Sequence, residues 1–537
     1  MSKKLVSRYN QWLFGAVAFL LIFIPLYPKI PLFSPIEQYI VRVRLEDIFI
    51  ALIGLYWLGL LVLRKVIVPQ KVLGLIALYV VVSGISLFSA IFVLGSIPQQ
   101  QVHIAKSVLH LFRYIEYFSL LFLAFSAVRT KKQLQIVLSL ITGIVIATSI
   151  YGVGQRYFQF PVYSTMNREF SKGVRLVLES PYARVQSTFA GHYDFGAFLV
   201  ITLPVILALA LLAQDRYSRW FAWTGFTFGV WGLLASASRS SFIGFLGGIG
   251  IVLLLTSLLE KKLIAQVISF CKKSLISYGL VGAMMLLFGG NLTQLFVNTI
   301  QGIPVLNTVY LTALELLPQS DKIDNAVIPQ YTNPVPAKNT EAEEEDSSTE
   351  RPPDVYVDIP DKIEVITISD TGVEVITYQE RPRTFSQCAQ EKGLSLCIRL
   401  EALWPQAING FKRNPLLGSG FATLNKKNIF HFPDADGTDN NYLRILGETG
   451  VLGLITFFSI IGYVVFIAIK ILIQTMPASS SMKSNALYQV VAIGYIAGTA
   501  GLLVNAIYID VFVASKVAYM FWSMTGVLLA VSRFKKT

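Results

Sequence analysis

Long apolar runs separated by short polar segments dominate the chain. Twelve of these runs approach the length that a lipid bilayer requires, with allowance for short or tilted ones. They are residues 12–26, 48–63, 72–93, 118–128, 137–151, 195–213, 220–235, 242–259, 275–288, 451–472, 490–507 and 513–531. Because helices satisfy all their backbone groups at such lengths in lipid, the pattern predicts an all-α polytopic membrane protein with about twelve transmembrane helices.

Composition and charge support this class and orient it. Hydrophobic residues make up 54% of the 537 residues and charged residues 14%, against about 25% charged in soluble domains, and the mean hydropathy is +0.59. The net charge of +13 comes mostly from Lys and Arg at the ends of the apolar runs, which argues against nucleic-acid binding. Placing these clusters in the cytoplasm satisfies the positive-inside rule, with Arg42 and Arg44 as a small exception, and puts both termini inside.

This topology divides the chain into four parts. Residues 1–151 hold the N-terminal spans, 152–290 the core spans with a first outer loop, 291–441 a large extracytoplasmic loop, and 442–537 the C-terminal spans. Within the large loop, residues from about 338 to 354 are acidic and almost without apolar side chains, which predicts a flexible insert. Apolar and polar residues alternate on both sides of residues 370–372, which predicts a small β-hairpin.

The last part of the large loop returns to a helical period. One stripe is formed by Leu396, Leu400, Leu403, Trp404 and Ile408. Pro405 within it implies a kink or a late helix start, and Asn414 followed by Pro415 ends the helix. Cys388 and Cys397 are close enough in sequence to form a disulfide, with two free thiols as the alternative.

Two arginines stand at the predicted outer mouths of spans, Arg184 and Arg239. An arginine at membrane depth is costly unless it is paired or lines a hydrated cavity. The alternative for Arg239 is a side chain that snorkels to the interface. Arginine binds phosphate in a bidentate way and stays charged, so the pair points to a lipid-linked phosphate or diphosphate.

A polar stretch precedes the span at 451–472, and its acidic and imidazole side chains are candidate general bases. They are His431, Asp434, Asp436, Asp439 and Glu448. The alternative is a polar turn that caps the helix beginning near Tyr442, since Thr438, Asp439 and Asn440 are all good N-cap residues. We find no strong metal signature and no nucleotide-binding motif, so neither a metal nor a cofactor is expected.

Three blocks of sequence resemble the O-antigen ligase and polymerase superfamily of bacterial envelope glycosyltransferases. The first two are "ARVQSTFAGHYDFGAFLVITLPVILAL", with Arg184, and "LLASASRSSFIGFLGG", with Arg239. The third is "IRLEALWPQAINGFKRNPLLGSGF" followed by "TDNNYLRILGETGVLGLITFF". In order and spacing the resemblance covers residues 184–458 and implies a membrane architecture like that of the GT-C glycosyltransferases.

The resemblance also implies an activity. Members transfer a glycan from a polyprenyl-diphosphate-linked oligosaccharide to a glycan or lipid acceptor, without a metal and with inversion. The expected location is the cytoplasmic (inner) membrane, with the active site on its extracytoplasmic face. Membrane lipids and envelope polysaccharide assembly proteins are the further partners that this reading implies.

Residues carry over with the blocks. Arg184 and Arg239 match the diphosphate-binding arginines, and Asp439 stands where the ligases have a catalytic histidine. This departure favours a polymerase or exopolysaccharide-type transferase over a strict ligase, and it requires that burial raise the pKa of Asp439. His431, by folding back, is the alternative replacement. The remaining substrate-binding candidates are His192, Arg399, Asn440, Tyr442, Arg444, His431 and Glu448.

A transporter or flippase of lipid-linked oligosaccharide is the competing hypothesis. It would use charged residues buried within the spans, of which Glu116 near Arg113 is the clearest example. Such a pair has a second interpretation, as an internal contact at a helix end. The large outer loop favours the enzyme.

Overall fold

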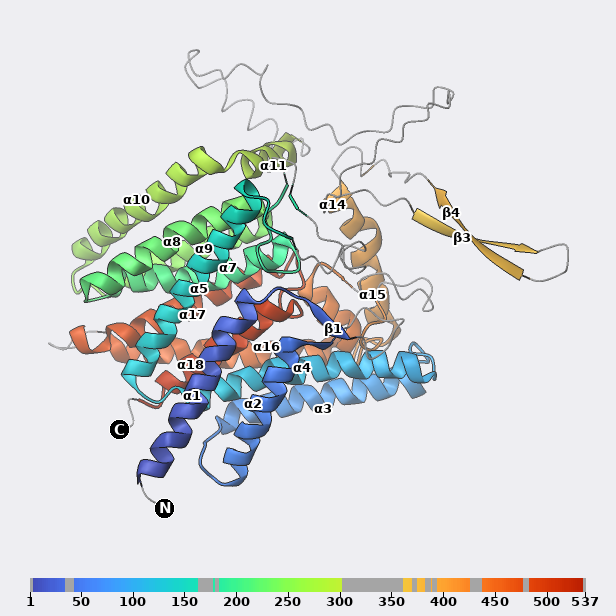
Figure 1. Ribbon diagram of the computed structural model, residues 1–537, viewed down its shortest axis with the longest axis horizontal. Coiled ribbons are helices and arrows are strands. Elements are labelled where there is room, and N and C mark those ends of the chain that lie inside the picture. The colour runs from blue at the N-terminus through green and yellow to red at the C-terminus, as the bar shows by residue number, and fades with distance from the viewer. Residues whose placement is uncertain are drawn as a thin grey trace, which may run out of the picture.

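The structure is a computed structural model, and it describes residues 3–33, 43–162, 177–178, 183–301, 361–368, 374–381, 388, 394–424, 437–476 and 482–534. Helices dominate these residues, which confirms the all-α class (Figure 1). Before the large loop they are α1 (Lys3–Leu26), α2 (Leu45–Val62), α3 (Gln70–Phe92), α4 (Gln101–Ala127), α5 (Lys131–Tyr157), α7 (His192–Leu212), α8 (Arg216–Ser236), α9 (Arg239–Ser257), α10 (Leu263–Phe288) and α11 (Gly290–Gln301). After it come α14 (Leu394–Ile398), the π-helix η2 (Arg399–Leu403), α15 (Trp404–Arg413), α16 (Asn441–Thr475), α17 (Met482–Asn505) and α18 (Ser515–Val531).

The number of spans differs from the predicted twelve. Within the described ranges, ten helices are long and apolar enough to cross a membrane, and Ser515–Val531 is a shorter apolar helix. The predicted span at 220–235 forms α8, which is not among the ten. Two arginines in its first turn, together with several Trp and Gly residues, make α8 less hydrophobic than its neighbours.

Helix α7 forms the centre of the bundle. It packs against α17, α8 and α9, and most of its side chains are buried. Close packing with α17 depends on small residues: a Cβ at Gly498 would lie 2.7 Å from the carbonyl oxygen of Ile201, and one at Gly494 would lie 2.6 Å from the Cα of Val205. Helices associate in lipid through such small-residue contacts, because lipid tails offer no hydrophobic driving force between them.

Helix α16 is broken at Gly450, whose backbone (φ 66°, ψ −168°) is not helical. The loop 414–424 fills the break. Ser419 and Gly420 donate backbone N–H bonds to the carbonyls of Gly447 and Glu448, at 2.8 and 2.9 Å. Irregular backbone at membrane depth is tolerated only where the protein satisfies its polar groups, and this loop does so.

Several predictions about the large loop are confirmed. Strands β3 (Asp361–Ile368) and β4 (Glu374–Arg381) pair in antiparallel register as the expected hairpin. Cys388 and Cys397 form a disulfide. Pro405 lies in the first turn of α15, and α15 ends before Asn414. A short pairing of β1 (Pro31–Phe33) with β2 (Val43–Arg44) was not predicted. The acidic insert lies outside the described residues, and the four-part division of the chain stays a prediction.

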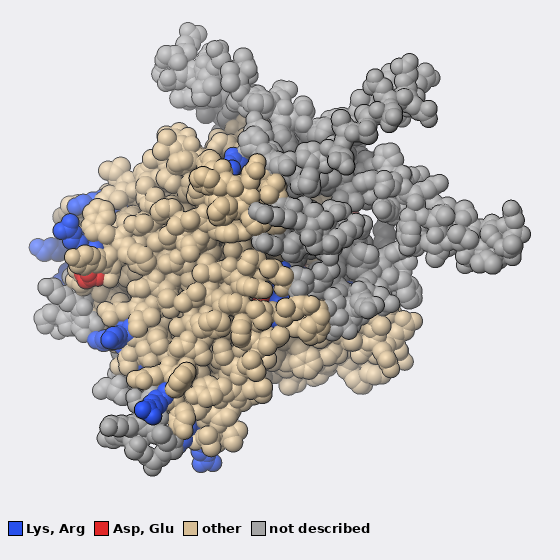
Figure 2. All heavy atoms as spheres, in the orientation of Figure 1, with Lys and Arg blue, Asp and Glu red and all other residues tan. Residues whose placement is uncertain are grey.

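Lys and Arg side chains gather at one end of the molecule. Figure 2 shows them along the left edge, the end at which both termini lie in Figure 1, whereas α14, α15 and the hairpin lie at the opposite end. The orientation in which this basic end faces the cytoplasm stays a prediction.

Candidate functional site

Arg184 and His192 meet at the start of α7. A guanidinium N–H of Arg184 donates to the Nε2 of His192 across 3.0 Å. The neighbouring backbone is held by Val185, whose N–H donates to the carbonyl of Ala235 at 3.0 Å. His192 is buried, and its ring lies against that of Tyr193 with 4.0 Å between centroids. The first two residues of the predicted site therefore form one unit.

Arg239 lies beside this unit. It is the first residue of α9 and follows a left-handed turn at Ala237 (φ 48°) that joins α8 to α9. Its Nη1 donates to the carbonyl of Leu295 in α11 at 3.4 Å. Arg239 is also within electrostatic range of Arg184 and Arg399, so three guanidinium groups converge here.

Arg399 and Asp439 form an ion pair, with 2.9 Å between Nη2 and Oδ2. Arg399 is buried in the π-helix, where its guanidinium lies 5.3 Å from the ring centre of Tyr508 and 6.0 Å from that of Tyr193. Single π-turns occur frequently at functional sites. Asp439 is thus in direct contact with one of the three clustered arginines.

Asp439 has the properties of a general base. Its backbone is in the left-handed region (φ 51°), and 39% of its side-chain surface is exposed. Desolvation by the surrounding protein raises the pKa of its carboxyl to about 6; Arg399 opposes this rise and the negative charge of Asp510 adds to it. The carboxyl is therefore mostly ionised at pH 7, and its pKa lies much closer to 7 than the pKa of an ordinary aspartate does.

Asp510 is a site residue that the sequence reasoning missed. One carboxylate oxygen accepts from the backbone N–H of Thr438 at 2.8 Å and from Arg444 at 2.9 Å, and the other accepts from the N–H of Asn440 at 3.1 Å. It thus holds the residues on both sides of Asp439. One signal was available, because Asp510 is the single acidic residue after Glu448 and lies between two apolar runs.

Four further candidates make contacts within the protein. Asn440 caps α16 by accepting from the N–H of Leu443 at 3.0 Å, and the hydroxyl of Tyr442 donates to the carbonyl of Leu503 at 2.9 Å. Arg444 lies 3.5 Å from Glu448 as well as contacting Asp510, and Glu448 accepts from the N–H of Ala422 at 3.1 Å. These contacts support the N-terminal half of α16. The other predicted bases, His431, Asp434 and Asp436, lie outside the described residues.

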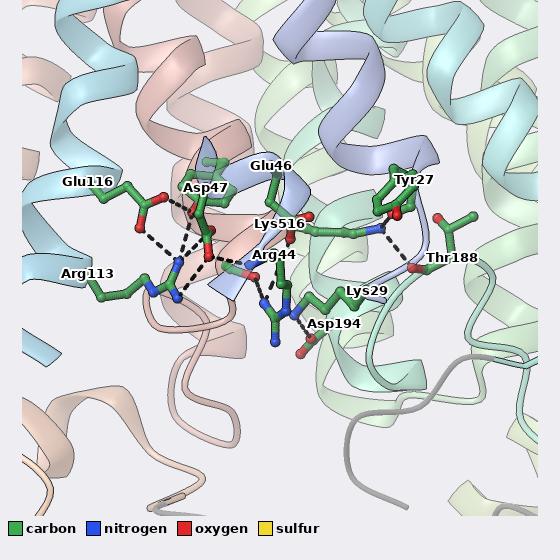
Figure 3. Close-up of polar contacts among 12 residues, drawn as sticks. Tyr27, Lys29, Arg44, Glu46, Asp47, Arg113, Glu116, Thr188, Asp194 and Lys516 are labelled. Carbon is green, nitrogen blue, oxygen red and sulfur yellow. Dashed lines mark hydrogen bonds and ion pairs between the residues drawn. The ribbon is translucent and has the colours of Figure 1, made fainter. Parts of the chain in front are cut away.

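A network of buried and partly buried charges borders the site on the side of the N-terminal helices (Figure 3). Arg113 donates to Asp47 and to Glu116, both at 2.8 Å, and the hydroxyl of Tyr519 donates to Glu116 at 2.8 Å. The alternative reading of Glu116, as part of an internal contact, is therefore the one that the geometry supports. Figure 3 labels four cations and four carboxylates in this network: Lys29, Arg44, Arg113 and Lys516, with Glu46, Asp47, Glu116 and Asp194.

These features define a class: a polytopic helical membrane protein in which three arginines cluster beside the carboxylates of Asp439 and Asp510. Within the described ranges, no group of three or more His, Cys, Asp or Glu side chains is placed to hold a metal ion.

Comparison with known families identifies the class more closely. Residues 224–458 match the family model of O-antigen ligase. This match covers somewhat less than half of the chain, supports the superfamily that the sequence resembles, and suggests glycan transfer of the ligase or polymerase type. Arg239, Arg399 and Asp439 lie inside the matched segment, and Arg184, His192 and Asp510 lie outside it. No curated protein matches the chain.

Proposed function

We propose that the protein transfers an oligosaccharide from a polyprenyl-diphosphate donor to a glycan or lipid acceptor at the extracytoplasmic face of the inner membrane. The observation that carries this proposal is the convergence of Arg184, Arg239 and Arg399 beside Asp439, a carboxylate with a pKa of about 6. Arg184 and Arg239 bind the diphosphate, with His192 in contact with Arg184. Arg399 orients Asp439.

The proposed reaction is a single displacement. Asp439 accepts the proton of an acceptor hydroxyl, whose oxygen attacks the anomeric carbon of the donor sugar. The bond from that carbon to the diphosphate oxygen breaks, and the diphosphate leaves with the electron pair. Attack opposite to the leaving group inverts the anomeric centre. Arginines fixed at the position where charge develops stabilise the departing diphosphate, so we propose that the reaction needs no metal.

Among members of the superfamily, we propose a polymerase or an exopolysaccharide-type transferase. The support is Asp439, which by the resemblance takes the position of the ligase histidine. Its raised pKa and its ion pair with Arg399 allow an aspartate to act as the base at neutral pH. Envelope polysaccharide assembly proteins are the partners that such an enzyme would meet.

A transfer assay with the purified protein in lipid tests the proposal. The donor is polyprenyl-diphosphate oligosaccharide, with a glycan acceptor and without nucleotide or added metal. The wild type should extend the glycan. Arg239→Ala should lower the rate by about 10²–10³-fold, the usual effect of removing one stabilising donor. Asp439→Asn should lower it by about 10²–10⁴-fold, the usual contribution of a general base.

Matched controls come from the basic end of the molecule. Arg216→Ala removes an exposed arginine, and Asp215→Asn exchanges one good N-cap for another, so both should leave transfer unchanged. Full activity of both Arg184→Ala and Arg239→Ala would contradict the donor site. If the wild type made no product but moved the lipid-linked glycan across the bilayer, the protein would be a transporter.

A further inference from the structure

Lys516 has an unusual environment for a charged side chain. It is the second residue of α18 and is 1% exposed. Its ammonium donates to three backbone carbonyls: Tyr27 at 2.6 Å, Thr188 at 2.8 Å and Pro25 at 3.1 Å (Figure 3). Because an ammonium has three N–H donors, these carbonyls use its full hydrogen-bonding capacity.

Burial of this charge is expensive. Among the described residues, no carboxylate lies within ion-pair distance of Lys516, although the ring of Phe189 lies 5.0 Å from its Nζ and the charges of Glu46 and Asp194 act at longer range. The ammonium offsets this cost by donating to three carbonyls, each of which needs a donor when it is buried. A fully satisfied polar network of this kind holds the segments that it joins in one arrangement.

The three carbonyls belong to two segments that meet at the site. Pro25 and Tyr27 lie at the C-terminal end of α1, where helix carbonyls lack intrahelical partners. Thr188 lies midway between Arg184 and His192. A second link runs parallel to the first, because Lys29 pairs with Asp194 in the first turn of α7 at 3.5 Å. The end of α1 is thus joined to the segment that carries the first half of the site.

We propose that Lys516 is a positioning residue for the donor site. By clamping Thr188 to the end of α1, it places Arg184 and His192 at the distance from Arg239 and Arg399 that one diphosphate requires. The assignment of the ligand rests on the proposed function, whereas the clamp itself does not. Lys516 is too deeply buried to touch the substrate, so its effect passes through Arg184.

Loss of the ammonium should shift the segment without unfolding it. Ser187, next to Thr188, keeps its own anchor, since its N–H donates to the Oε1 of Gln155 at 2.8 Å and its carbonyl accepts from Nε2 of the same side chain at 2.9 Å. Small displacements matter at such sites: a shift of about 1 Å costs up to about 10²-fold in rate. Because Arg184 both binds the donor and stabilises the departing diphosphate in the proposed reaction, the effect should appear in kcat/KM for the donor.

The test compares Lys516→Met and Lys516→Arg with a matched control, Arg533→Met. Like Lys516, Arg533 is a cation that donates hydrogen bonds to carbonyls at a helix end, those of Phe125 and Val128. It differs in lying at the basic end of the molecule. Lys516→Met should lower kcat/KM for the donor about 10–100-fold. Lys516→Arg should give a smaller loss, because its guanidinium still donates to part of the carbonyls; recovery should be incomplete, since a planar guanidinium cannot direct three N–H groups from one nitrogen. Arg533→Met should leave kcat/KM for the donor unchanged.

Hydrogen–deuterium exchange supplies a readout that does not depend on activity. Exchange in residues 183–191 should become faster in Lys516→Met and stay unchanged in Arg533→Met. If Lys516→Met and Arg533→Met had the same kcat/KM for the donor and the same exchange in residues 183–191, the clamp would be overturned. A wild type without transfer activity would overturn the proposed function instead, and the exchange measurement would still decide whether Lys516 holds the segment.

Discussion

Asp510 provides the sharpest test of how Asp439, the proposed catalytic carboxylate, is held. Its two oxygens accept three hydrogen bonds, from the backbone of Thr438 and Asn440 and from Arg444. Asp510→Asn leaves one oxygen and turns the other acceptor into an NH₂ donor. In one orientation of the amide, the NH₂ replaces the oxygen that accepts from Thr438 and Arg444, so it faces both of these donors. In the other orientation, the NH₂ faces the N–H of Asn440. Each orientation therefore places donor groups against one another.

The magnitude follows from these contacts. Arg444 and Asp510 are only 5% and 12% exposed, and breaking a buried pair costs about 3–5 kcal/mol. Because Arg444 keeps its contact with Glu448, we expect the loss to lie at the lower end, about 3 kcal/mol. That is enough to let the left-handed turn at Asp439 relax. A displacement of about 1 Å would lower kcat by about 10²-fold.

The pH dependence separates this effect from simple misfolding. Asp439 must be ionised to accept a proton, so the wild-type rate should rise with pH through a midpoint near 6, the value to which burial raises its pKa. Asp510 contributes to that rise through its negative charge. Removing the charge should move the acidic limb of the kcat profile to lower pH while the maximum falls.

The assay is the transfer reaction measured from pH 4.5 to 8.5, with thermal melting to confirm the fold. Asp215→Asn, at the basic end, is the matched control and should reproduce the wild-type profile. A folded Asp510→Asn variant with unchanged kcat and an unchanged acidic limb would refute the reasoning that this residue positions Asp439.

Three further predictions follow from single contacts. Arg399→Met should shift the acidic limb to higher pH, because the guanidinium lowers the pKa of Asp439 and its loss removes that effect; an unshifted pH profile would contradict the 2.9 Å pair. Gly450→Ala should destabilise the protein by about 1–3 kcal/mol or more, because φ is 66° and the new Cβ would lie 2.3 Å from the carbonyl of Leu416. The control Gly462→Ala adds a Cβ in open space and should not lower the melting temperature. Arg113→Met should cost about 2–3 kcal/mol, because it leaves two partly buried carboxylates without their cation. Adding Asp47→Asn and Glu116→Gln to the same chain should recover most of this loss; a triple variant as unstable as the single one would count against the network.

The helices were largely predictable because the bilayer imposes a simple rule on composition. Each predicted span lies within or overlaps a helix of the structure, and the hairpin was predicted from alternation alone. The number of spans was less predictable. α8 has the length of a span but not the hydropathy, and α18 has 17 residues, so a pattern of apolar runs overstates how many helices qualify.

The candidate site was predictable only in part. Arg184, Arg239 and Asp439 stand out in the sequence because charges near apolar runs are costly. Arg444 and Glu448 stand out for the same reason, yet the structure engages them with Asp510 and Ala422. Lys29 and Lys516 have no local signal that separates them from the basic residues at other span ends, although one pairs with Asp194 and the other binds carbonyls of α1.

The sequence by itself determined the membrane class, the helical segments, the end of the molecule that carries the basic charge, and the residue types of an anion site. These properties depend on local composition and periodicity, which the chain displays in order. Tertiary structure alone decided that Arg399 pairs with Asp439, that Asp510 holds the turn around it, and that Lys516 joins α1 to the segment of Arg184. Such contacts join residues tens to hundreds of positions apart, and their distances depend on how whole helices pack.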